Sequence, residues 1–385
     1  MSLIKVAVDA SRVRSGGGVA HLVGILNITD PTQFGIAEIH VWAYQKLLDM
    51  LPEHAWLIKH HPPALERSLL YQLSWQATKL AKEIQTEGCH ILFSADASTL
   101  CRFKPMVVLN QNMLAYDAGV LALFGFGKDR VQQTLMYFVQ RAAFKFAQAS
   151  IFLTEHAATQ VQRKVGPLSQ AVCISHGVAQ IFKDTAAKAQ WPSDKSRPIR
   201  CLYVSPVFEY KHQLEVVQAV AMLREQGFAI SLAIVGGGGA RAKKLLAKQL
   251  QVSDPNKDFI QVLEFIPNEH IASMLEQADL FVFASSCETF GIALLEAMTV
   301  GVPIACSKRS SLPETLRDGG EYFDPQDPGS IAHALKVLIE QPAKRAEYSS
   351  RAKALAASYS WQRCATETWR FIARCYAQTG NANST

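Results

Sequence analysis

The sequence predicts an α/β protein made of two doubly wound, Rossmann-like domains. The 385 residues suffice for two domains of about 150 residues or more. Short apolar runs alternate with stretches of helical spacing, which indicates parallel sheets covered by helices on both faces. A polar stretch at 180–200, with Pro192 and Pro198, interrupts this alternation. We therefore expect domains at 1–185 and 186–361, with a final helix at 362–385 that packs back on the first.

The first half is expected to contain short buried strands joined by helices. The triplet Gly16–Gly18 follows the first strand and precedes a helix that begins near Val19. The strands are expected at Ile4–Val8, His90–Ser94, Met106–Asn110, Ser150–Thr154 and Gln170–Ile174, and the clearest helical spacings are at Ile36–Leu51 and Leu69–Ile84.

The second half restarts the alternation and predicts a doubly wound sheet of its own. Its strands are expected at Ile199–Val204, Ser231–Val235, Phe259–Leu263, Leu280–Ala284 and Pro303–Ser307. Its helices are expected at Gln213–Gln226, Ala240–Gln251, Asn268–Gln277, Phe290–Thr299, Ile331–Glu340, Ala343–Tyr359 and Thr366–Ala377. The two sheets are expected to bind ligands at the carboxyl ends of their strands.

Composition excludes several classes of protein. Hydrophobic residues make up 49% and charged residues 19%, which is typical of globular proteins rather than disordered ones. A net charge of +6 is too weak to indicate nucleic acid, but it suits a phosphorylated ligand or an anionic lipid surface. The eight cysteines include no C-x-x-C pair, which argues against a zinc cluster or disulfide framework. With no leader sequence and no apolar run of about 18 residues, we expect a cytoplasmic protein.

The most informative segment runs from Ser285 to Met298, where an apolar strand turns into a helix. Thr289 is the expected N-cap, and the helix N-terminus beside Gly291 offers free N–H groups to an anion such as a diphosphate. Glu288 precedes the helix and Glu296 lies within it, about 12 Å further along at the helical rise. The two carboxylates could hold two ends of one long ligand. Equally, they could serve only the helix dipole and the helix surface.

This segment resembles the signature of retaining glycosyltransferases of family 4, which have the GT-B architecture. The similarity lies in two glutamates eight positions apart and in the motifs that follow them in the order that the family shows. These are Glu288, Phe290-Gly291-Ile292, Glu296-Ala297-Met298, Gly301-Val302-Pro303, Ser311-Leu312-Pro313-Glu314 and Phe323-Asp324-Pro325. Three motifs of the first half are similar to members that build bacterial surface polysaccharides and lipopolysaccharide. They are Gln111-Asn112-Met113-Leu114, Phe152-Leu153-Thr154-Glu155 and Ser175-His176-Gly177-Val178.

The resemblance implies a catalytic pair, Lys211 and Glu288. Lys211 would neutralise the departing diphosphate, and Glu288 would orient the donor sugar. Many members also have a cation where this chain has Pro206. The remaining donor-binding residues implied by the resemblance are Gly17, Gly18, Gly237, Gly238, Phe265, Thr289, Phe290, Gly291, Ile292 and Glu296, with Glu296 on the ribose.

The expected reaction moves a hexose, with mannose as our guess, from a nucleotide diphosphate sugar to a hydroxyl of a saccharide or lipid-linked saccharide. The anomeric configuration would be retained. The sequence contains no Asp-x-Asp pair, so we expect no metal at the diphosphate, and no other cofactor is implied. Many family members have a histidine after a middle strand of the first domain. This chain has Asn110-Gln111-Asn112-Met113 there, and Asn112 is the only substitute we suggest.

The sequence alone leaves two other functions open. Gly237-x-Gly239-x-x-Ala242 satisfies a relaxed dinucleotide fingerprint, as in an NAD-dependent oxidoreductase. A noncatalytic nucleotide-sugar-binding protein of the same fold is the other alternative.

A stretch with alternating cations and apolar residues is typical either of a peripheral membrane surface or of a core helix with solvated edges. It comprises Leu121, Phe124, Phe126, Lys128, Arg130, Tyr137, Phe138, Arg141, Phe144 and Lys145.

Overall fold

The computed structural model describes residues 3–14, 16–28, 30–187, 191–192 and 197–382. The chain forms two compact units. The first comprises Met1–Leu121, Gly125–Gly177 and Ser360–Thr385, and the second comprises Ala122–Phe124 and Val178–Tyr359. Apart from the short segment Ala122–Phe124, the chain crosses between the units at 177/178 and 359/360, whereas we expected the crossings at 185/186 and 361/362. Part of the expected connection, at 188–190 and 193–196, and the last three residues of the expected final helix lie outside the described residues.

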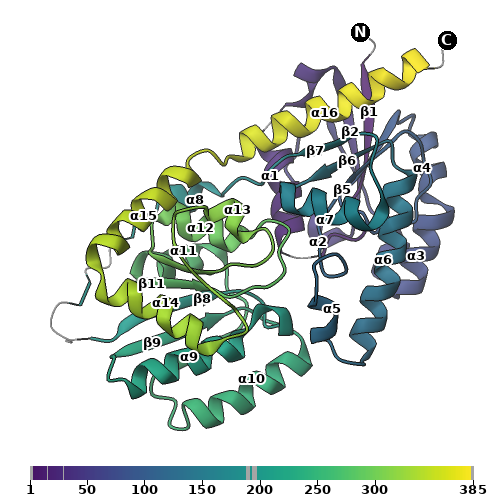
Figure 1. Cartoon of the computed structure of the whole chain (residues 1–385). Helices are drawn as coiled ribbons and strands as arrows, with labels where there is room; N and C mark the ends of the chain where they lie inside the picture. The colour runs from purple at the N-terminus through teal and green to yellow at the C-terminus, as the bar shows by residue number, and fades with distance from the viewer. Residues whose placement is uncertain (1–2, 15, 29, 188–190, 193–196, 383–385) are drawn as a thin grey trace. The chain divides into compact units, whose positions relative to one another are not determined.

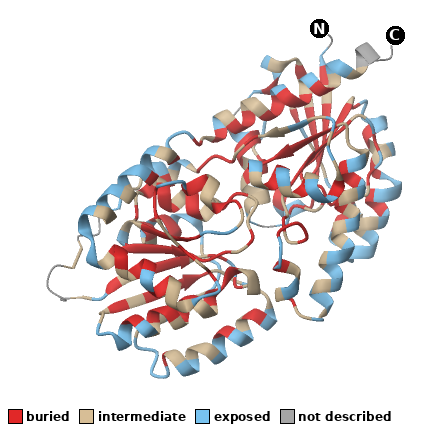
Figure 2. Cartoon of the chain, viewed as in Figure 1, coloured by how far each residue is buried: buried red, intermediate tan, exposed pale blue. Residues whose placement is uncertain are grey.

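The first unit contains a seven-stranded parallel sheet with the strand order β3-β2-β1-β4-β5-β6-β7. Figure 1 labels β1, β2, β5, β6 and β7 of this sheet. Its strands are β1 (Ile4–Asp9), β2 (Ile36–Trp42), β3 (Leu57–His60), β4 (Ile91–Ser94), β5 (Met106–Leu109), β6 (Ala149–Phe152) and β7 (Ala171–Cys173). Strands β1, β4, β5 and β6 are buried in the centre of the unit (Figure 2), whereas the edge strands β3 and β7 are largely exposed or half-buried. Its helices are α1 (Gly17–Ile28), η1 (Pro31–Phe34), α2 (Gln45–Leu48), η2 (Pro63–Glu66), α3 (Leu69–Thr78), α4 (Leu80–Thr86), α5 (Val120–Leu123), α6 (Lys128–Phe146), α7 (Glu155–Val165) and α16 (Trp361–Ala382), of which α5 extends into the second unit.

The second unit contains a six-stranded parallel sheet with the order β10-β9-β8-β11-β12-β13. Its strands are β8 (Ile199–Val204), β9 (Ile230–Val235), β10 (Ile260–Leu263), β11 (Leu280–Phe283), β12 (Ile304–Ser307) and β13 (Glu321–Phe323). Its helices are α8 (Gln180–Lys183), η3 (Glu209–Lys211), α9 (Gln213–Glu225), α10 (Ala240–Ser253), α11 (Asn268–Gln277), α12 (Ile292–Val300), α13 (Leu312–Leu316), α14 (Pro328–Glu340) and α15 (Pro342–Ala356). Both units are therefore doubly wound, as predicted.

One predicted helix is wrong. Residues Ile36–Leu51 form the strand β2 and the short helix α2. Ile36, Ile39 and Ala43 follow one another at helical spacing, but β2 lies between β1 and β3, and its residues from Ile39 onward are buried. The β-branched and aromatic residues of Ile36–Trp42 favour a strand buried on both faces. Strands β3 and β13 are also absent from the sequence prediction.

The final helix, α16, packs on α1 within the first unit. The indole of Trp361 fills the space beside Gly24, where an added Cβ would lie 2.3 Å from the ring. Trp369 Nε1 donates a hydrogen bond to the carbonyl oxygen of Ile25 at 3.2 Å. These contacts hold α16 against the second half of α1.

Candidate active site

The candidate site of the second unit lies where its strand order reverses. Strands β8 and β11 are neighbours in the sheet, although two βα repeats separate them in the chain. Loops that follow such strands diverge to opposite sides, and open α/β sheets bind their ligands in the crevice between these loops. Lys211 follows β8 and Glu288 follows β11. The structure therefore brings the two predicted catalytic residues together.

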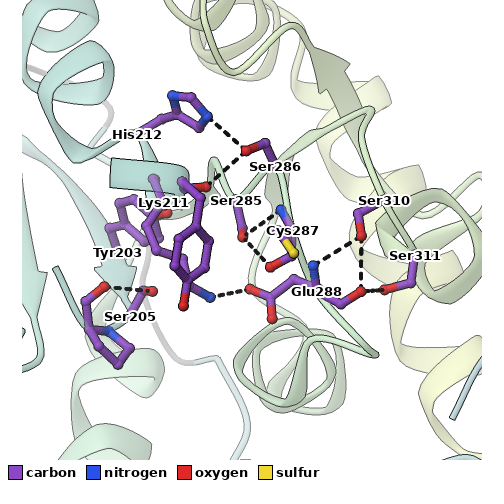
Figure 3. A network of polar contacts seen from close by, with 12 residues as sticks. Tyr203, Ser205, Lys211, His212, Ser285, Ser286, Cys287, Glu288, Ser310 and Ser311 are labelled. Atoms are coloured by element: carbon purple, nitrogen blue, oxygen red, sulfur yellow. Dashed lines mark hydrogen bonds and ion pairs between the residues drawn. The ribbon is translucent and has the colours of Figure 1, made fainter. Parts of the chain in front are cut away.

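Lys211 ends η3, and its ammonium forms an ion pair with Oε1 of Glu288 (Figure 3). The lysine is only 7% exposed, which is unusual for this residue type and requires a partner for the charge. Its Nζ also lies 5.2 Å from the centroid of the Tyr210 ring and 5.6 Å from that of Phe283. The hydroxyl of Tyr203 donates a hydrogen bond to the carbonyl oxygen of Lys211. The lysine is thus held by its backbone, by two aromatic faces and by one carboxylate.

The backbone of Glu288 is fixed by two serines that sequence analysis missed. The N–H of Glu288 donates to Oγ of Ser310 at 3.0 Å, and its carbonyl oxygen accepts from Ser310 and Ser311 at 2.9 and 3.0 Å. Ser310 has φ 58°, a conformation that non-glycine residues rarely adopt. Ser311 opens one of the motifs that carry the resemblance, and that is the one signal that could have indicated this pair.

A second bridge between the two loops involves His212 and Ser286. His212 Nε2 lies 3.0 Å from Oγ of Ser286, and the N–H of Ser286 donates to the carbonyl oxygen of Tyr210 at 2.8 Å. His212 has φ 53°, so the chain turns sharply just before α9. These contacts connect the loop after β8 to the loop after β11 at a point separate from the ion pair.

The helix after Glu288 begins later than predicted. α12 starts at Ile292, and its N-cap is Gly291 with φ 92°, so the prediction of Thr289 as the cap is wrong. The first intrahelical bond runs from the N–H of Leu295 to the carbonyl oxygen of Gly291 at 3.1 Å. The preceding N–H groups, from Ile292 onward, therefore have no acceptor within the helix. Phe290 is buried and its ring packs 5.5 Å from that of Tyr359, which makes its side chain part of the core.

Glu296 lies one turn inside α12 and is half-buried. No described residue donates a hydrogen bond to its carboxyl group. Burial raises the pKa of Glu296 from its usual 4.5 to about 8. A carboxyl group in this condition is largely neutral at pH 7 and can both donate and accept hydrogen bonds.

The glycine loop after β9 packs against the loop after β8. A Cβ at Gly236 would lie 2.5 Å from the carbonyl oxygen of Ser205, and one at Gly238 would lie 2.3 Å from that of Val207. The N–H of Val207 donates to the carbonyl oxygen of Gly237 at 2.7 Å. Close backbone approach thus accounts for these glycines. Dinucleotide fingerprints follow the strand at the reversal point, whereas this loop follows β9, one strand away.

Phe265 follows β10 and is 82% exposed. Its neighbour Glu264 forms an ion pair with Lys243, and Gly236 donates its N–H to the carbonyl oxygen of Leu263 at 3.0 Å. The loop that carries Phe265 therefore lies beside the glycine loop at the carboxyl edge of the sheet. A large aromatic side chain left this exposed is a candidate surface for a flat ligand group.

The other predicted residues, Gly17, Gly18 and Asn112, lie in the first unit. Gly17 and Gly18 are the first residues of α1, and the left-handed conformation in this turn belongs to Gly16, with φ 63°. Asn112 accepts a hydrogen bond from the N–H of Leu114 at 2.8 Å, so its side-chain oxygen closes a local turn.

The fold and the motifs are those of known proteins. Residues 184–355 match the family model described as glycosyl transferases group 1. The chain is 34% identical over 120 residues to O-antigen chain mannosyltransferase B of Escherichia coli, which covers 31% of this chain and 32% of that protein. This chain thus aligns with about a third of the relative's length.

Two solved structures resemble the whole chain. Sucrose-phosphate synthase from Thermosynechococcus elongatus has a TM-score of 0.77 at 18% identity, covering 97% of this chain and all of the other. The Anabaena protein HepE, solved with UDP and glucose, has a TM-score of 0.70 at 18% identity, covering 96% of this chain and all of the other. The fold is GT-B, as the sequence predicted. The family model supports the expected resemblance to glycosyltransferases over residues 184–355, and the O-antigen relative supports the resemblance to those of bacterial surface polysaccharides.

The pKa of Glu296 makes stability depend on pH. Its pKa is about 8 in the folded chain and near 4.5 when unfolded, so between these values the folded state holds a proton that the unfolded state lacks. Stability should therefore fall as pH rises through this window. The Glu296→Gln variant should lack this contribution. The urea midpoint of the variant, relative to that of the parent chain, should therefore rise between pH 5 and pH 8. The exposed Glu225→Gln variant is the control, and parallel profiles for parent and Glu296→Gln would refute the assignment.

Proposed function

We propose that this chain is a retaining, metal-independent hexosyltransferase that uses a nucleotide diphosphate sugar as donor. The observation that carries the proposal is the buried ion pair of Lys211 and Glu288 at the reversal point of the second sheet, beside the N-terminus of α12. Buried opposite charges at the carboxyl edge of an open sheet form a site for a ligand that has both an anion and hydroxyl groups.

The donor would contact this site along its whole length. Its diphosphate would accept hydrogen bonds from the ammonium of Lys211 and from the first N–H groups of α12, at Gly291 and Ile292. Glu288 would accept hydrogen bonds from the sugar hydroxyls, and the neutral carboxyl of Glu296 would bind the ribose. Phe265 would stack on the base. The backbone of Gly237 and Gly238 would lie beneath the nucleotide. Thr289 and Phe290 would shape the loop around the diphosphate.

The transfer step follows from these positions. The oxygen of an acceptor hydroxyl forms a bond to the anomeric carbon on the face from which the diphosphate leaves, and the bond from that carbon to the phosphate oxygen breaks. The hydroxyl proton passes to the departing phosphate oxygen. Lys211 stabilises the negative charge that develops on that oxygen.

The acceptor is proposed to be a saccharide or lipid-linked saccharide of a cell-surface polysaccharide, and the sugar to be mannose. The similarity to an O-antigen chain mannosyltransferase supports both. A noncatalytic nucleotide-sugar-binding protein would share the binding residues without turnover. An NAD-dependent oxidoreductase has less support, because the fingerprint glycines follow β9 and pack against residues 205–207.

Replacing Glu288 should separate binding from catalysis. Glu288→Gln keeps the size of the side chain but loses charge-assisted hydrogen bonds to the sugar, so we expect turnover to fall about a hundredfold or more. Binding of the nucleotide diphosphate alone, measured by calorimetry, should change little. Glu225→Gln, an exposed glutamate of α9, is the matched control. Normal turnover in Glu288→Gln would refute the role of Glu288.

The role of Lys211 is tested together with metal independence. Lys211→Ala should lose several kcal/mol of transition-state stabilisation, on the order of a hundredfold or more in kcat/KM. The exposed lysine variant Lys248→Ala should retain full activity. Transfer by the parent chain should continue in EDTA. Recovery of a lost rate by Mg²⁺ or Mn²⁺ would contradict a diphosphate site that works without a divalent ion.

Helix α6 is proposed to hold the chain at an anionic membrane surface. Val131, Leu135 and Phe138 lie at helical spacing along α6 and are exposed, as is Phe126 just before it. The Arg130 guanidinium lies 5.1 Å from the Phe126 ring centroid. Phe124 and Phe144, which the sequence placed on this surface, are buried instead. In the described residues no helix has the length and apolar character to cross a bilayer.

Vesicle binding tests this surface. The parent chain should sediment with anionic vesicles at low salt, since each cation near such a surface contributes about 1 kcal/mol, and salt should weaken this binding. Replacing Lys128, Arg130, Arg141 and Lys145 with glutamine should reduce it at least tenfold. The control replaces Lys46, Arg67, Lys79 and Lys82, four exposed cations elsewhere in the first unit. Equal loss in both folded variants, or no binding by the parent, would exclude α6.

A further inference from the structure

Two histidines and a glutamate meet at the β2–β3 edge of the first sheet. His40 lies on β2, His60 ends β3, and Glu87 follows α4 directly. His40 Nδ1 lies 2.9 Å from His60 Nε2 and 3.8 Å from Oε2 of Glu87. All three of these atoms lie within 4.8 Å of one another. None of these residues has a role in the proposed sugar transfer.

The separations suit a single divalent cation. Two atoms bound to a tetrahedral zinc ion at 2.0–2.1 Å lie about 3.3 Å apart, and the two measured distances, 2.9 and 3.8 Å, lie on either side of that value. Two imidazoles and one carboxylate form a donor set that zinc accepts, with a fourth position left for water.

The hydrogen bonding around His40 prepares it as a ligand. His40 Nε2 lies 3.0 Å from Oε2 of Glu38, and Lys5 Nζ lies 2.7 Å from the same oxygen. Donation from Nε2–H to Glu38 leaves the lone pair of His40 on Nδ1, the atom that faces His60 and Glu87. Ligating histidines usually have such a carboxylate on the far nitrogen, where it fixes the tautomer and the ring orientation.

The rings are held in place and remain accessible. The Trp42 ring stacks on that of His60 with centroids 4.3 Å apart, and Trp42 Nε1 donates to Glu83 on α4 at 3.0 Å. His40 is buried, His60 is half-buried and Glu87 is exposed. His60 also lines a cavity of about 820 Å³. A cation can therefore reach ligands that packing has already oriented.

We propose that His40, His60 and Glu87 form a zinc site, with Glu38 as the carboxylate that orients His40. The site would join β2 and β3 to the end of α4, and it lies in the first unit, whereas Lys211 and Glu288 lie in the second. The sequence predicted no metal-binding residue, because it has no C-x-x-C pair and no Asp-x-Asp motif. His40, His60 and Glu87 come from separate elements, which only the fold brings together.

Metal titration of the full chain tests the site. After treatment with EDTA and dialysis, calorimetry with Zn²⁺ should give one site per chain, and Co²⁺ should give visible d–d bands of a protein complex. Glu87→Gln should weaken Zn²⁺ binding at least tenfold, and Glu38→Gln should weaken it tenfold to a hundredfold through the orientation of His40. Both changes lie on partly exposed residues, and a urea transition checks that each variant is folded.

The matched control is His61→Gln, which removes the neighbouring partly exposed histidine, paired with Glu66. It should leave the affinity for Zn²⁺ unchanged. The proposal is overturned if the parent chain shows no stoichiometric site, or if His61→Gln weakens binding as much as Glu87→Gln. Sugar transfer in EDTA should be unchanged, because none of the three ligands has a role in it, so a rate that only Mg²⁺ or Mn²⁺ restores would count against the metal-free diphosphate site and not against this one.

Discussion

The loops of the candidate site meet at one ion pair, that of the buried Lys211 and the half-buried Glu288. Moving an ammonium and a carboxylate out of water costs several kcal/mol per ion, and only good geometry with further hydrogen bonds offsets this cost. Removing one partner of such a pair typically costs about 3–5 kcal/mol, because the other charge stays buried and unpaired. The surrounding contacts supply the geometry and the hydrogen bonds that offset this desolvation cost.

Those contacts restrain backbone more than side chains. Tyr203 donates to the carbonyl oxygen of Lys211, while Ser310 and Ser311 hold both backbone groups of Glu288. Gly236 and Gly238 allow the neighbouring loop to approach within distances that no side chain would permit. The positions of the two charges are therefore set by the loops before any ligand is present, which is the condition under which electrostatic stabilisation is effective.

The sequence predicted the two sheets well because alternating apolar runs and helical spacings are local patterns. The pair of Lys211 and Glu288 came from the resemblance of their motifs, and the structure places the two side chains in contact; their catalytic roles stay a prediction. The prediction failed at Ile36–Trp42, where burial on both faces of the sheet overrides helical spacing, and at Thr289, because the chain turns at Gly291 before the helix starts. The roles of Ser310 and His212 depend on strand order, which no single segment contains.

The two candidate sites of this chain differ in how far the sequence alone indicates them. Lys211 and Glu288 sit in motifs that also shape their own loops, so the local sequence carries both the turn and the charge. His40, His60 and Glu87 come from a strand, a strand end and a helix end, and nothing within each segment distinguishes it from a structural edge. Their meeting follows only from the adjacency of β2 and β3 and from the contact of Trp42 with Glu83 on α4. A ligand set of this kind becomes detectable only when the sheet order is known.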